Sequence, residues 1–364
     1  MQFSIFHITM GRGRTSDRQV YDDFLSDVAL AERLPYHTFW LAEHHFDSNF
    51  CMSPSPNLLL AAAAVLTKRI NIGTSINILP FHNPVRMAEE VAMLDLLSNG
   101  RYQWGIGRGI TGGEFAGFGI DPAESLDRFR EAHDFLLKAW ATGDMQWDGH
   151  FFKVPAGTHL APAITQKPHP PVWVTAQSPS SVEWAAERGY PIMQVSETLE
   201  TSRTQLERYR ATARKAGKTP DERGEIIPCR YVFVAETEQE AREIGGRQII
   251  EWWHEFTSIT APKAGAQRTK GYEYWQDKKK GFIHRTSGMD LDEMLEGGLV
   301  LVGTPKQVIR QIERHIEAFE TRHILCDFWR AGKSRADRQS SMTLFGERVI
   351  PYFVPSGARL AATA

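Results

Sequence analysis

Apolar and polar positions follow two different patterns along most of the chain. Short apolar runs are typical of β-strands, and apolar residues three or four positions apart are typical of helices. The predicted strands span 3–8, 38–41, 70–79, 102–106, 172–175, 192–195, 228–235 and 323–328. The predicted helices span 21–34, 57–66, 84–97, 122–140, 180–188, 200–216, 305–319 and 338–350. Strands and helices therefore alternate along nearly the whole chain.

This alternation amounts to about eight strand–helix pairs. Strands joined through helices form a parallel sheet, and eight such pairs can close into a (β/α)8 TIM barrel. We therefore predict an α/β fold with a single barrel domain over residues 1–364, and an open doubly wound sheet is the alternative. Thr304, followed by proline and with Gln307 three positions later, predicts a capping box at the start of a late helix.

Two segments interrupt the alternation. Residues 143–171 are rich in proline, glycine and histidine, and residues 262–298 combine clustered cations with aromatic residues and little apolar periodicity. A long irregular segment inside a compact domain is usually either a functional lid or disordered. We predict that 262–298 is a mobile lid insertion.

The amino-acid composition argues against several classes of binding partner. The 364 residues carry a formal net charge of −2, so there is no electrostatic case for nucleic acid or an anionic membrane. The three cysteines are far apart in the sequence, which argues against a disulfide framework. No basic leader is visible, and the longest apolar stretch, 58–66, is too short to span a bilayer. We expect a cytoplasmic protein.

Polar side chains follow several of the predicted strands. They are Glu43, His44, His45, Asn77, Arg108, Gln177 and Ser178. In a parallel barrel, the carboxyl ends of the strands and the loops after them form the active face. We therefore expect these side chains to surround one opening.

The stretch Glu43-His44-His45 allows three interpretations: a metal site, a proton-handling site beside a cofactor, and an inert strand end. Neighbouring side chains of an extended chain point to opposite faces, so both imidazoles should not reach one ion. The sequence also lacks HxH and HExxH metal motifs. Metal binding is therefore disfavoured. We expect one imidazole to face the opening and the other to pack against a neighbouring element.

Two stretches are candidates for binding an anion. Residues 107–112 match GxGxxG, but they follow the fourth strand and do not open a helix directly, unlike a dinucleotide-binding fingerprint. Arg108 between two glycines is better interpreted as a cation that an anion can approach closely. In residues 175–184 a strand ends, and hydroxyl residues with Pro179 then open a helix, with Ser180 and Glu183 as a candidate capping box. Backbone N–H groups at such a helix start bind phosphate. Considered alone, that stretch could equally be a plain helix cap. Considered together with Arg108, the stretch favours a phosphate site.

Several stretches resemble, in order along the chain, the bacterial luciferase-like flavin-dependent monooxygenases, and the luciferase alpha subunit most of all. They are EHHF at 43–46, NPVRMAEEVAMLDLLSNGR at 83–101, GRG at 107–109, FGID at 118–121, SPSSVEWAAERG at 178–189, TKGYEYW at 269–275, VGTP at 302–305 and VIPYF at 349–353.

The resemblance implies a (β/α)8 barrel that uses reduced FMN (FMNH2) supplied by a separate NAD(P)H:flavin reductase. It also implies a homodimer formed through the second and third helices. The family's chemistry is reaction of the flavin with O2 to a C4a-hydroperoxide, which here would oxygenate a small apolar substrate such as an aldehyde or a ketone. A non-catalytic flavin-binding subunit and a metal-dependent hydrolase are the alternatives. Retention of both His44 and the lid argues against the subunit.

Carried over by motif, the resemblance implies roles for individual residues. His44 is expected to be the catalytic base. Glu43 and a bulge at Ser75-Ile76, with a cis peptide bond between these two residues, are expected beside the flavin. The expected ribityl and phosphate contacts are Arg108, Ala176, Gln177, Ser178 and Ser181.

The chain also departs from the luciferase alpha subunit, so light emission is not implied. Gly107 replaces a cysteine, Gln177 replaces a carboxylate, and Leu126 replaces an arginine that helps to hold the phosphate, with Arg128 as a candidate substitute. We expect the glycine to leave more room beside the reactive flavin carbon and therefore to admit a bulkier or cyclic substrate.

Overall fold

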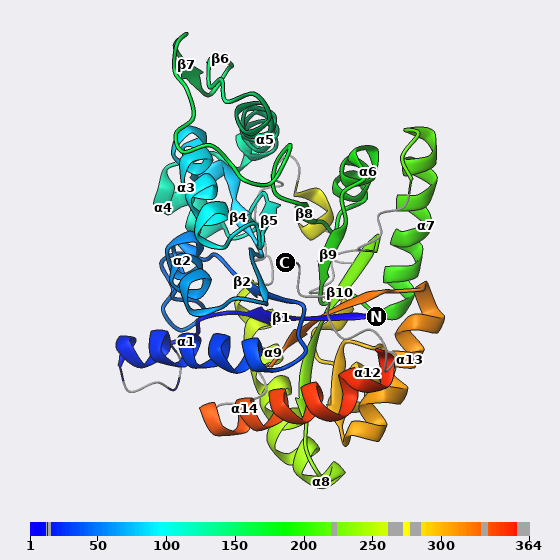
Figure 1. Cartoon of the computed structure of the whole chain (residues 1–364). Coiled ribbons are helices and arrows are strands. Elements are labelled where there is room, and N and C mark those ends of the chain that lie inside the picture. The colour runs from blue at the N-terminus through cyan, green and yellow to red at the C-terminus, as the bar shows by residue number, and fades with distance from the viewer. Residues whose placement is uncertain are drawn as a thin grey trace.

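The computed structural model is a parallel β-barrel surrounded by helices, and it describes residues 1–11, 13, 16–219, 224–260, 272–276, 285–328 and 334–354 (Figure 1). Around the barrel, the strands are β1 (Gln2–His7), β2 (Thr38–Leu41), β3 (Asn71–Thr74), β5 (Tyr102–Gly107), β8 (Val172–Thr175), β9 (Ile192–Val195), β10 (Ile226–Val234) and β12 (His323–Asp327). The sheet is closed because β10 pairs with both β9 and β12, and β12 pairs with β1. The predicted (β/α)8 barrel is confirmed, and the open sheet is wrong.

Two further short strands extend the barrel at its carboxyl end. β4 (Asn77–Ile78) pairs with β5, and β11 (Val300–Gly303) pairs with the second half of β10. The single strand predicted at 70–79 is therefore two strands, β3 and β4, separated by Ser75 and Ile76. The strand at β11 was not predicted.

The longer helices cover the outside of the barrel, except α9 (Arg247–Thr260), which packs against the cluster inside it and lines the cavity. They are α1 (Asp17–Arg33), α2 (Pro56–Leu66), α3 (Pro84–Leu97), α5 (Ser125–Thr142), α6 (Pro179–Arg188), α7 (Leu199–Lys215), α9, α13 (Pro305–Phe319) and α14 (Arg335–Leu344). The shorter ones are α4 (Gly112–Phe118), α8 (Glu238–Glu240), α10 (Glu273–Gln276), α12 (Leu291–Glu296) and α15 (Ile350–Phe353). The capping box predicted at Thr304 is confirmed, with Gln307 as its partner. No helix in these described ranges is long and apolar enough to cross a membrane.

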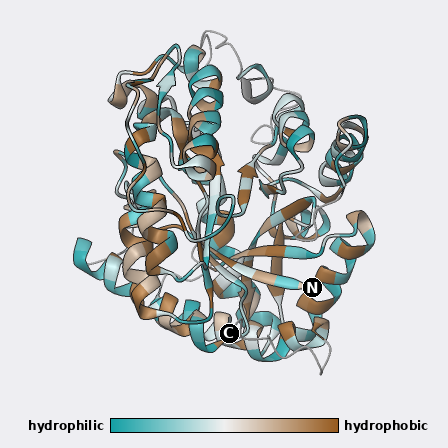
Figure 2. Cartoon of the chain, turned by 45° about the horizontal axis from the view of Figure 1, so that its top comes forward, coloured by the Kyte–Doolittle hydropathy of each residue, from teal (hydrophilic) through white to brown (hydrophobic). Residues whose placement is uncertain are grey.

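The core has two layers because successive strand residues point to opposite faces of the sheet. In β2, Phe39 and Leu41 belong to the cluster between the sheet and the helices, and Trp40 belongs to the cluster inside the barrel. The Trp40 and Trp173 rings meet edge to face inside the barrel, 5.1 Å apart. Figure 2 shows this arrangement as hydrophobic strands at the centre and hydrophilic residues on the outer helix surfaces. Because both faces of each strand are buried, the strand sequences are continuous apolar runs.

The two irregular segments differ in what the structure describes. Residues 143–171 contain a small antiparallel hairpin of β6 (Trp147–Asp148) and β7 (Lys153–Val154), which projects at the top of Figure 1. In the predicted lid, residues 262–271 and 277–284 lie outside the described residues. Mobility of the lid stays a prediction.

Candidate active site

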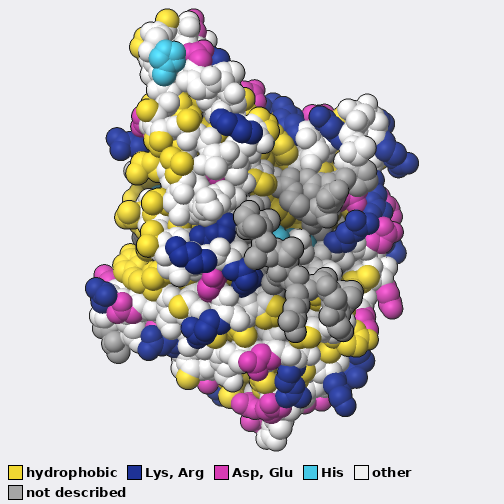
Figure 3. Space-filling view, viewed as in Figure 1, with side chains coloured by type: hydrophobic (Ala, Val, Ile, Leu, Met, Phe, Trp, Pro, Cys, Tyr) yellow, Lys and Arg dark blue, Asp and Glu magenta, His cyan; other side chains and the backbone are white. Residues whose placement is uncertain are grey.

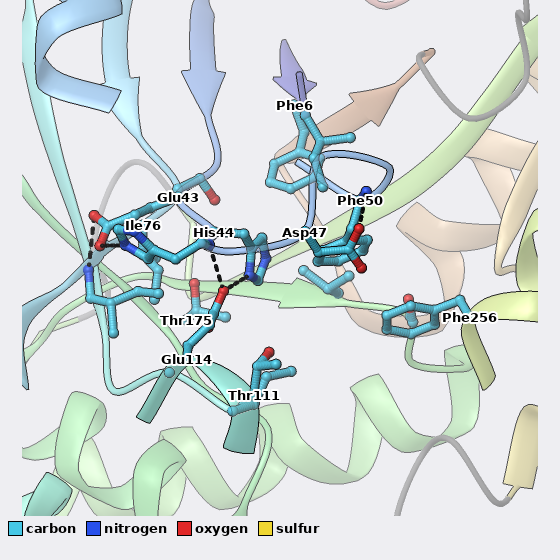
Figure 4. Close-up of a pocket in the computed structure, with 18 of the residues that line it drawn as sticks. Phe6, Glu43, His44, Asp47, Phe50, Ile76, Thr111, Glu114, Thr175 and Phe256 are labelled. Carbon is cyan, nitrogen blue, oxygen red and sulfur yellow. Dashed lines mark hydrogen bonds and ion pairs between the residues drawn. The ribbon is translucent and has the colours of Figure 1, made fainter. Parts of the chain in front are cut away.

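The carboxyl ends of the barrel strands surround one cavity of about 290 Å³ (Figure 4). Its lining includes nearly all the site residues expected from the sequence, namely Glu43, His44, Ser75, Ile76, Arg108, Gln177, Ser178 and Ser181. These residues follow β2, β3, β5 and β8, and parallel strands end at the same face of a barrel. The predicted convergence on one opening is therefore confirmed for these residues and for His45. Asn77 was also expected there, but it is buried behind Glu43, to which its side chain donates a hydrogen bond.

Ala176 differs from the other expected cofactor contacts. Its side chain is buried in the cluster between sheet and helices, whereas its neighbours Thr175 and Gln177 line the cavity. Any contact of Ala176 with a ligand would therefore come from its main chain.

His44 is held by a carboxylate that the sequence reading missed. The Nδ1 atom of His44 lies 2.9 Å from Oε1 of Glu114, and the same oxygen accepts the backbone N–H of His45 at 2.9 Å (Figure 4). Glu114 lies on α4 and is buried. Because a carboxylate accepts hydrogen bonds, Nδ1 carries the proton of this pair, and Nε2 is the atom left to exchange a proton in the cavity.

Glu43 ties the end of β2 to the segment after β3. Its carboxylate lies 2.9 Å from His82 Nε2 and 3.2 Å from His45 Nε2, and it accepts hydrogen bonds from Asn77 Nδ2 and the Ile78 backbone N–H, both at 3.3 Å. Burial raises the pKa of Glu43, but the charge of His82 and the hydrogen bonds from His45 and His82 outweigh burial and lower this pKa to about 2. Burial lowers the pKa of His82, and the Glu43 carboxylate reverses this, so that the pKa is raised. Glu43 is therefore ionised and built into the wall of the site.

The two histidines have different surroundings. His44 contacts Glu114 and lies 4.6 Å from the Phe50 ring. His45 packs edge to face against Phe118, at 4.7 Å between ring centroids, and its side chain is nearly buried. Both residues line the cavity, but only His45 is also packed into its wall, so the expectation that one imidazole faces the opening and the other packs is met only in part.

The start of α6 presents hydroxyl groups to the cavity. Ser178 caps this helix by accepting the backbone N–H of Ser181 at 3.3 Å, and the two hydroxyl oxygens lie 2.8 Å apart. The predicted Ser180–Glu183 capping box is wrong, because the helix begins at Pro179 and Glu183 instead accepts a hydrogen bond from Arg208 at 2.7 Å. The free N–H groups and dipole of this helix start suit a phosphate.

Arg108 and Gln177 complete the polar side of the cavity. Burial lowers the pKa of Arg108, and the neighbouring Tyr272 and Glu273 oppose that shift. Gln177 donates through Nε2 to the Val195 carbonyl, and its Oε1 is buried without a hydrogen-bond partner in the described part of the chain. This oxygen is available to accept a hydrogen bond from a ligand hydroxyl.

Arg128 does not take the place of the arginine replaced by Leu126. Its guanidinium instead donates to Glu124 at 3.0 Å and stands over the Phe151 ring, 4.4 Å from the centroid. The expected substitution is therefore not supported.

The Ser75–Ile76 peptide bond is cis, as expected. Gly107 lies against Ile76, and a Cβ atom added to Gly107 would collide with the Ile76 side chain. The expected free room at Gly107 is therefore wrong, because the Ile76 side chain fills it.

Aromatic rings line the part of the cavity beyond His44. Phe50 stacks on Phe256 with 5.8 Å between centroids, Phe256 stacks on Trp252 at 4.9 Å, and Phe6 and Tyr231 also line the cavity. Figure 4 shows Phe6, Phe50 and Phe256 on the side away from Glu43. Trp252 and Phe256 lie on α9, which was not predicted, although their four-residue spacing is a helical signal. Across the described ranges, no group of three or more His, Cys, Asp or Glu residues could hold a metal ion.

Comparison with known proteins identifies the family. A model of the family described as luciferase-like monooxygenase matches residues 1–322. The chain belongs to the luciferase-like monooxygenase family. The resemblance found in the sequence is therefore confirmed, and the chain is an enzyme of the flavin-dependent monooxygenase class.

Individual members of the luciferase-like monooxygenases match over most of the chain. An alkanal monooxygenase alpha chain from a Kryptophanaron alfredi symbiont is 30% identical over 359 residues, 97% of this chain and 98% of the relative. The oxygenase component of a flavin-dependent trigonelline monooxygenase from Acinetobacter baylyi is 34% identical over 247 residues, 66% of this chain and 67% of the relative. The crystal structure of a monooxygenase from Streptomyces bottropensis has a TM-score of 0.81 and 30% identity, and the match covers 97% of this chain and 100% of that one.

Proposed function

We propose that this chain is the oxygenase component of a two-component system that uses reduced FMN and O2 to oxygenate a small apolar substrate. A separate NAD(P)H:flavin reductase supplies the FMNH2. The proposal rests on the composition of one cavity. Arg108 and the hydroxyl groups at the start of α6 line it together with His44, which contacts Glu114, and with a group of aromatic rings.

The residues present fit a flavin mononucleotide. Arg108, Ser178 and Ser181 would hold the phosphate, and the unpartnered Oε1 of Gln177 would accept a ribityl hydroxyl. Ser75 and Ile76 would lie beside the ring system. Reduced FMN, when bound, would supply the electrons that activate O2.

The chain's own contribution is positioning, exclusion of water and control of one proton. The rings of Phe50, Trp252 and Phe256 favour an apolar substrate carrying a carbonyl or an oxidisable carbon, and they keep water from that part of the cavity. His44 exchanges a proton through Nε2, because Nδ1 is committed to Glu114. Glu43 keeps the end of β2 and the Ser75–Ile76 segment together.

Product analysis tests this function directly. The protein is mixed with FMN, NADH, O2 and a flavin reductase, and a panel of aldehydes, cyclic ketones and terpenoids is screened for a product containing one oxygen atom from O2. Substrate-dependent incorporation is expected. Tight binding of FMNH2 without any oxygenated product across the panel would favour the non-catalytic subunit.

Replacing Arg108 with alanine should weaken FMNH2 binding by about 1.5–3 kcal/mol, the usual size of a charge-assisted hydrogen bond. Reduced riboflavin lacks the phosphate and should bind wild type and variant equally. Anaerobic titration measures both affinities. Arg128→Ala is the matched control, because Arg128 is engaged with Glu124 and should not affect either ligand. Equal loss of FMN and riboflavin affinity would show that Arg108 is not a phosphate ligand.

Replacing Glu114 with alanine should lower the coupled turnover number by about 10- to 100-fold, the loss that follows when a carboxylate orienting a metal-bound histidine is removed. Substrate KM should change little, because Glu114 acts through His44. Glu114→Gln retains an acceptor for the His45 N–H and should recover part of the rate. In a His44→Ala background, Glu114→Ala should cause no further loss; an additional loss of similar size would refute the assigned role.

The homodimer is also part of the proposal. α2 and α3 pack together and expose large apolar side chains, namely Leu58, Val65, Leu66, Met93, Leu96 and Leu97. Figure 3 shows hydrophobic side chains gathered along the left edge, over these helices. Exposed apolar surface of this kind is typical of an interface.

A double variant, Val65→Glu and Met93→Glu, should therefore be a monomer, because it places charges in the apolar face. Light scattering should give about twice the chain mass of 41.2 kDa for the wild type and that single mass for the variant. Tyr352→Glu, which changes an exposed aromatic residue on α15, is the control and should stay dimeric. A monomeric wild type, or a dimeric double variant, would contradict the interface.

A further inference from the structure

Tyr272 contacts Arg108 and the residue that follows it. The guanidinium carbon of Arg108 lies 4.2 Å from the centroid of the Tyr272 ring. The Tyr272 hydroxyl donates to the Gly109 carbonyl at 2.9 Å and lies 3.3 Å from the Ser125 hydroxyl. The side chain is buried, with 6% of the residue exposed. Tyr272 is therefore fixed against the carboxyl end of β5 at both its ring and its hydroxyl.

This contact holds one face of the guanidinium and leaves its edges to other partners. A cation over the face of a tyrosine ring is attracted to it, more strongly when the pair is withdrawn from water. An arginine side chain loses several rotamers when it binds an anion, so stacking beforehand lowers that entropic cost. Arg108 lines the cavity, and Tyr272 is not among the described residues that do. Tyr272 thus supports Arg108 from outside the cavity.

We propose that Tyr272 is a positioning residue of the phosphate site, holding the Arg108 guanidinium in the orientation that binds the cofactor's phosphate. The inference rests on the proposed function, in which Arg108 is the phosphate ligand. It assigns part of the FMN affinity to the segment just before α10, through a residue that does not touch the phosphate.

A purely structural role for Tyr272 is the competing account. The ring also meets Phe115 edge to face, 6.1 Å away, and so contributes to packing around α4. Loss of packing would affect all flavins alike, because it does not depend on the phosphate. Loss of positioning would affect only ligands that carry a phosphate, and only while Arg108 is present.

The experiment is a double-mutant cycle read out by anaerobic titration with FMNH2 and with reduced riboflavin. Tyr272→Leu should weaken FMNH2 binding by roughly 3- to 30-fold, the range of a cation–π contact, and leave riboflavin unchanged. Tyr272→Phe keeps the ring face and should retain most of the affinity. In an Arg108→Ala background, Tyr272→Leu should have no effect on either ligand. Tyr272→Met is used if the leucine variant does not fold.

Glu273→Gln is the matched control within the same segment. It removes a negative charge that acts on Arg108, so it should not weaken FMNH2 binding. Equal losses for FMNH2 and riboflavin, or the same loss with and without Arg108, would overturn the inference. If Arg108→Ala changes the affinities for FMNH2 and riboflavin equally, the assignment of Arg108 as the phosphate ligand is wrong. If Arg108→Ala weakens the binding of FMNH2 alone and Tyr272→Leu changes neither affinity, only the positioning role of Tyr272 is refuted.

Discussion

Replacing His44 with alanine should lower coupled turnover by roughly 10²–10⁴-fold, the usual contribution of proton transfer by a placed side chain. The variant should fold and bind FMNH2, because the phosphate and ring contacts lie on other strands. Hydrogen peroxide should replace oxygenated product. Product yield and peroxide release, measured together, check this, and added imidazole should restore part of the rate by filling the vacated space.

His45→Ala is the matched comparison. His45 packs against Phe118 and contacts Glu43, so its loss should lower the free energy of unfolding more than the loss of His44 does. Activity should survive to the extent that the protein stays folded. A stable but inactive His45→Ala beside an active His44→Ala would reverse the assignment of the two imidazoles.

Replacing Glu43 with glutamine should cost about 3 kcal/mol of unfolding free energy near pH 6. A fall of the Glu43 pKa from 4.5 to about 2 corresponds to about that energy. The Glu43 carboxylate stabilises the folded protein fully at pH values above its pKa in the unfolded chain. The difference in unfolding free energy between wild type and variant should therefore shrink as pH falls from 4.5 towards 2. The pKa of His82 is raised, so His82 loses its charge, and with it the attraction to Glu43, as pH rises through that pKa. The difference in unfolding free energy should therefore shrink at high pH as well.

Denaturant unfolding at a series of pH values measures this difference. Glu236→Gln is the control, because Glu236 pairs with Arg348 on the surface, where ion pairs contribute about 0–1 kcal/mol. A difference for Glu43→Gln that stays constant between pH 3 and 6 would show that the carboxylate is not stabilised in its ionised form.

The barrel and much of its site could be predicted because they depend on local patterns. Strands buried on both faces read as apolar runs, and β2, β8 and β9 were predicted with their observed bounds. Once a parallel barrel is inferred, the residues after each strand must face one opening. That rule placed His44 and Arg108 in one cavity without any knowledge of distances.

The missed features depend on contacts between distant segments. Glu114 lies 70 positions from His44, on the unpredicted helix α4, whose glycines at 112, 113 and 117 are poor helix formers. No local pattern shows that a carboxylate there reaches an imidazole after β2. Likewise, the room expected at Gly107 depended on where Ile76 places its side chain, which only the folded structure shows.

The central claim is that this cavity takes reduced FMN and controls its reaction with O2. Rapid mixing of the anaerobic protein–FMNH2 complex with O2, followed by flavin absorbance and peroxide release, tests it most directly. Wild type should return oxidised flavin more slowly than free FMNH2 does, with little peroxide when substrate is present, and His44→Ala should release peroxide instead of product. Wild-type protein that returns oxidised flavin as fast as free FMNH2, with one peroxide per flavin, would contradict the account.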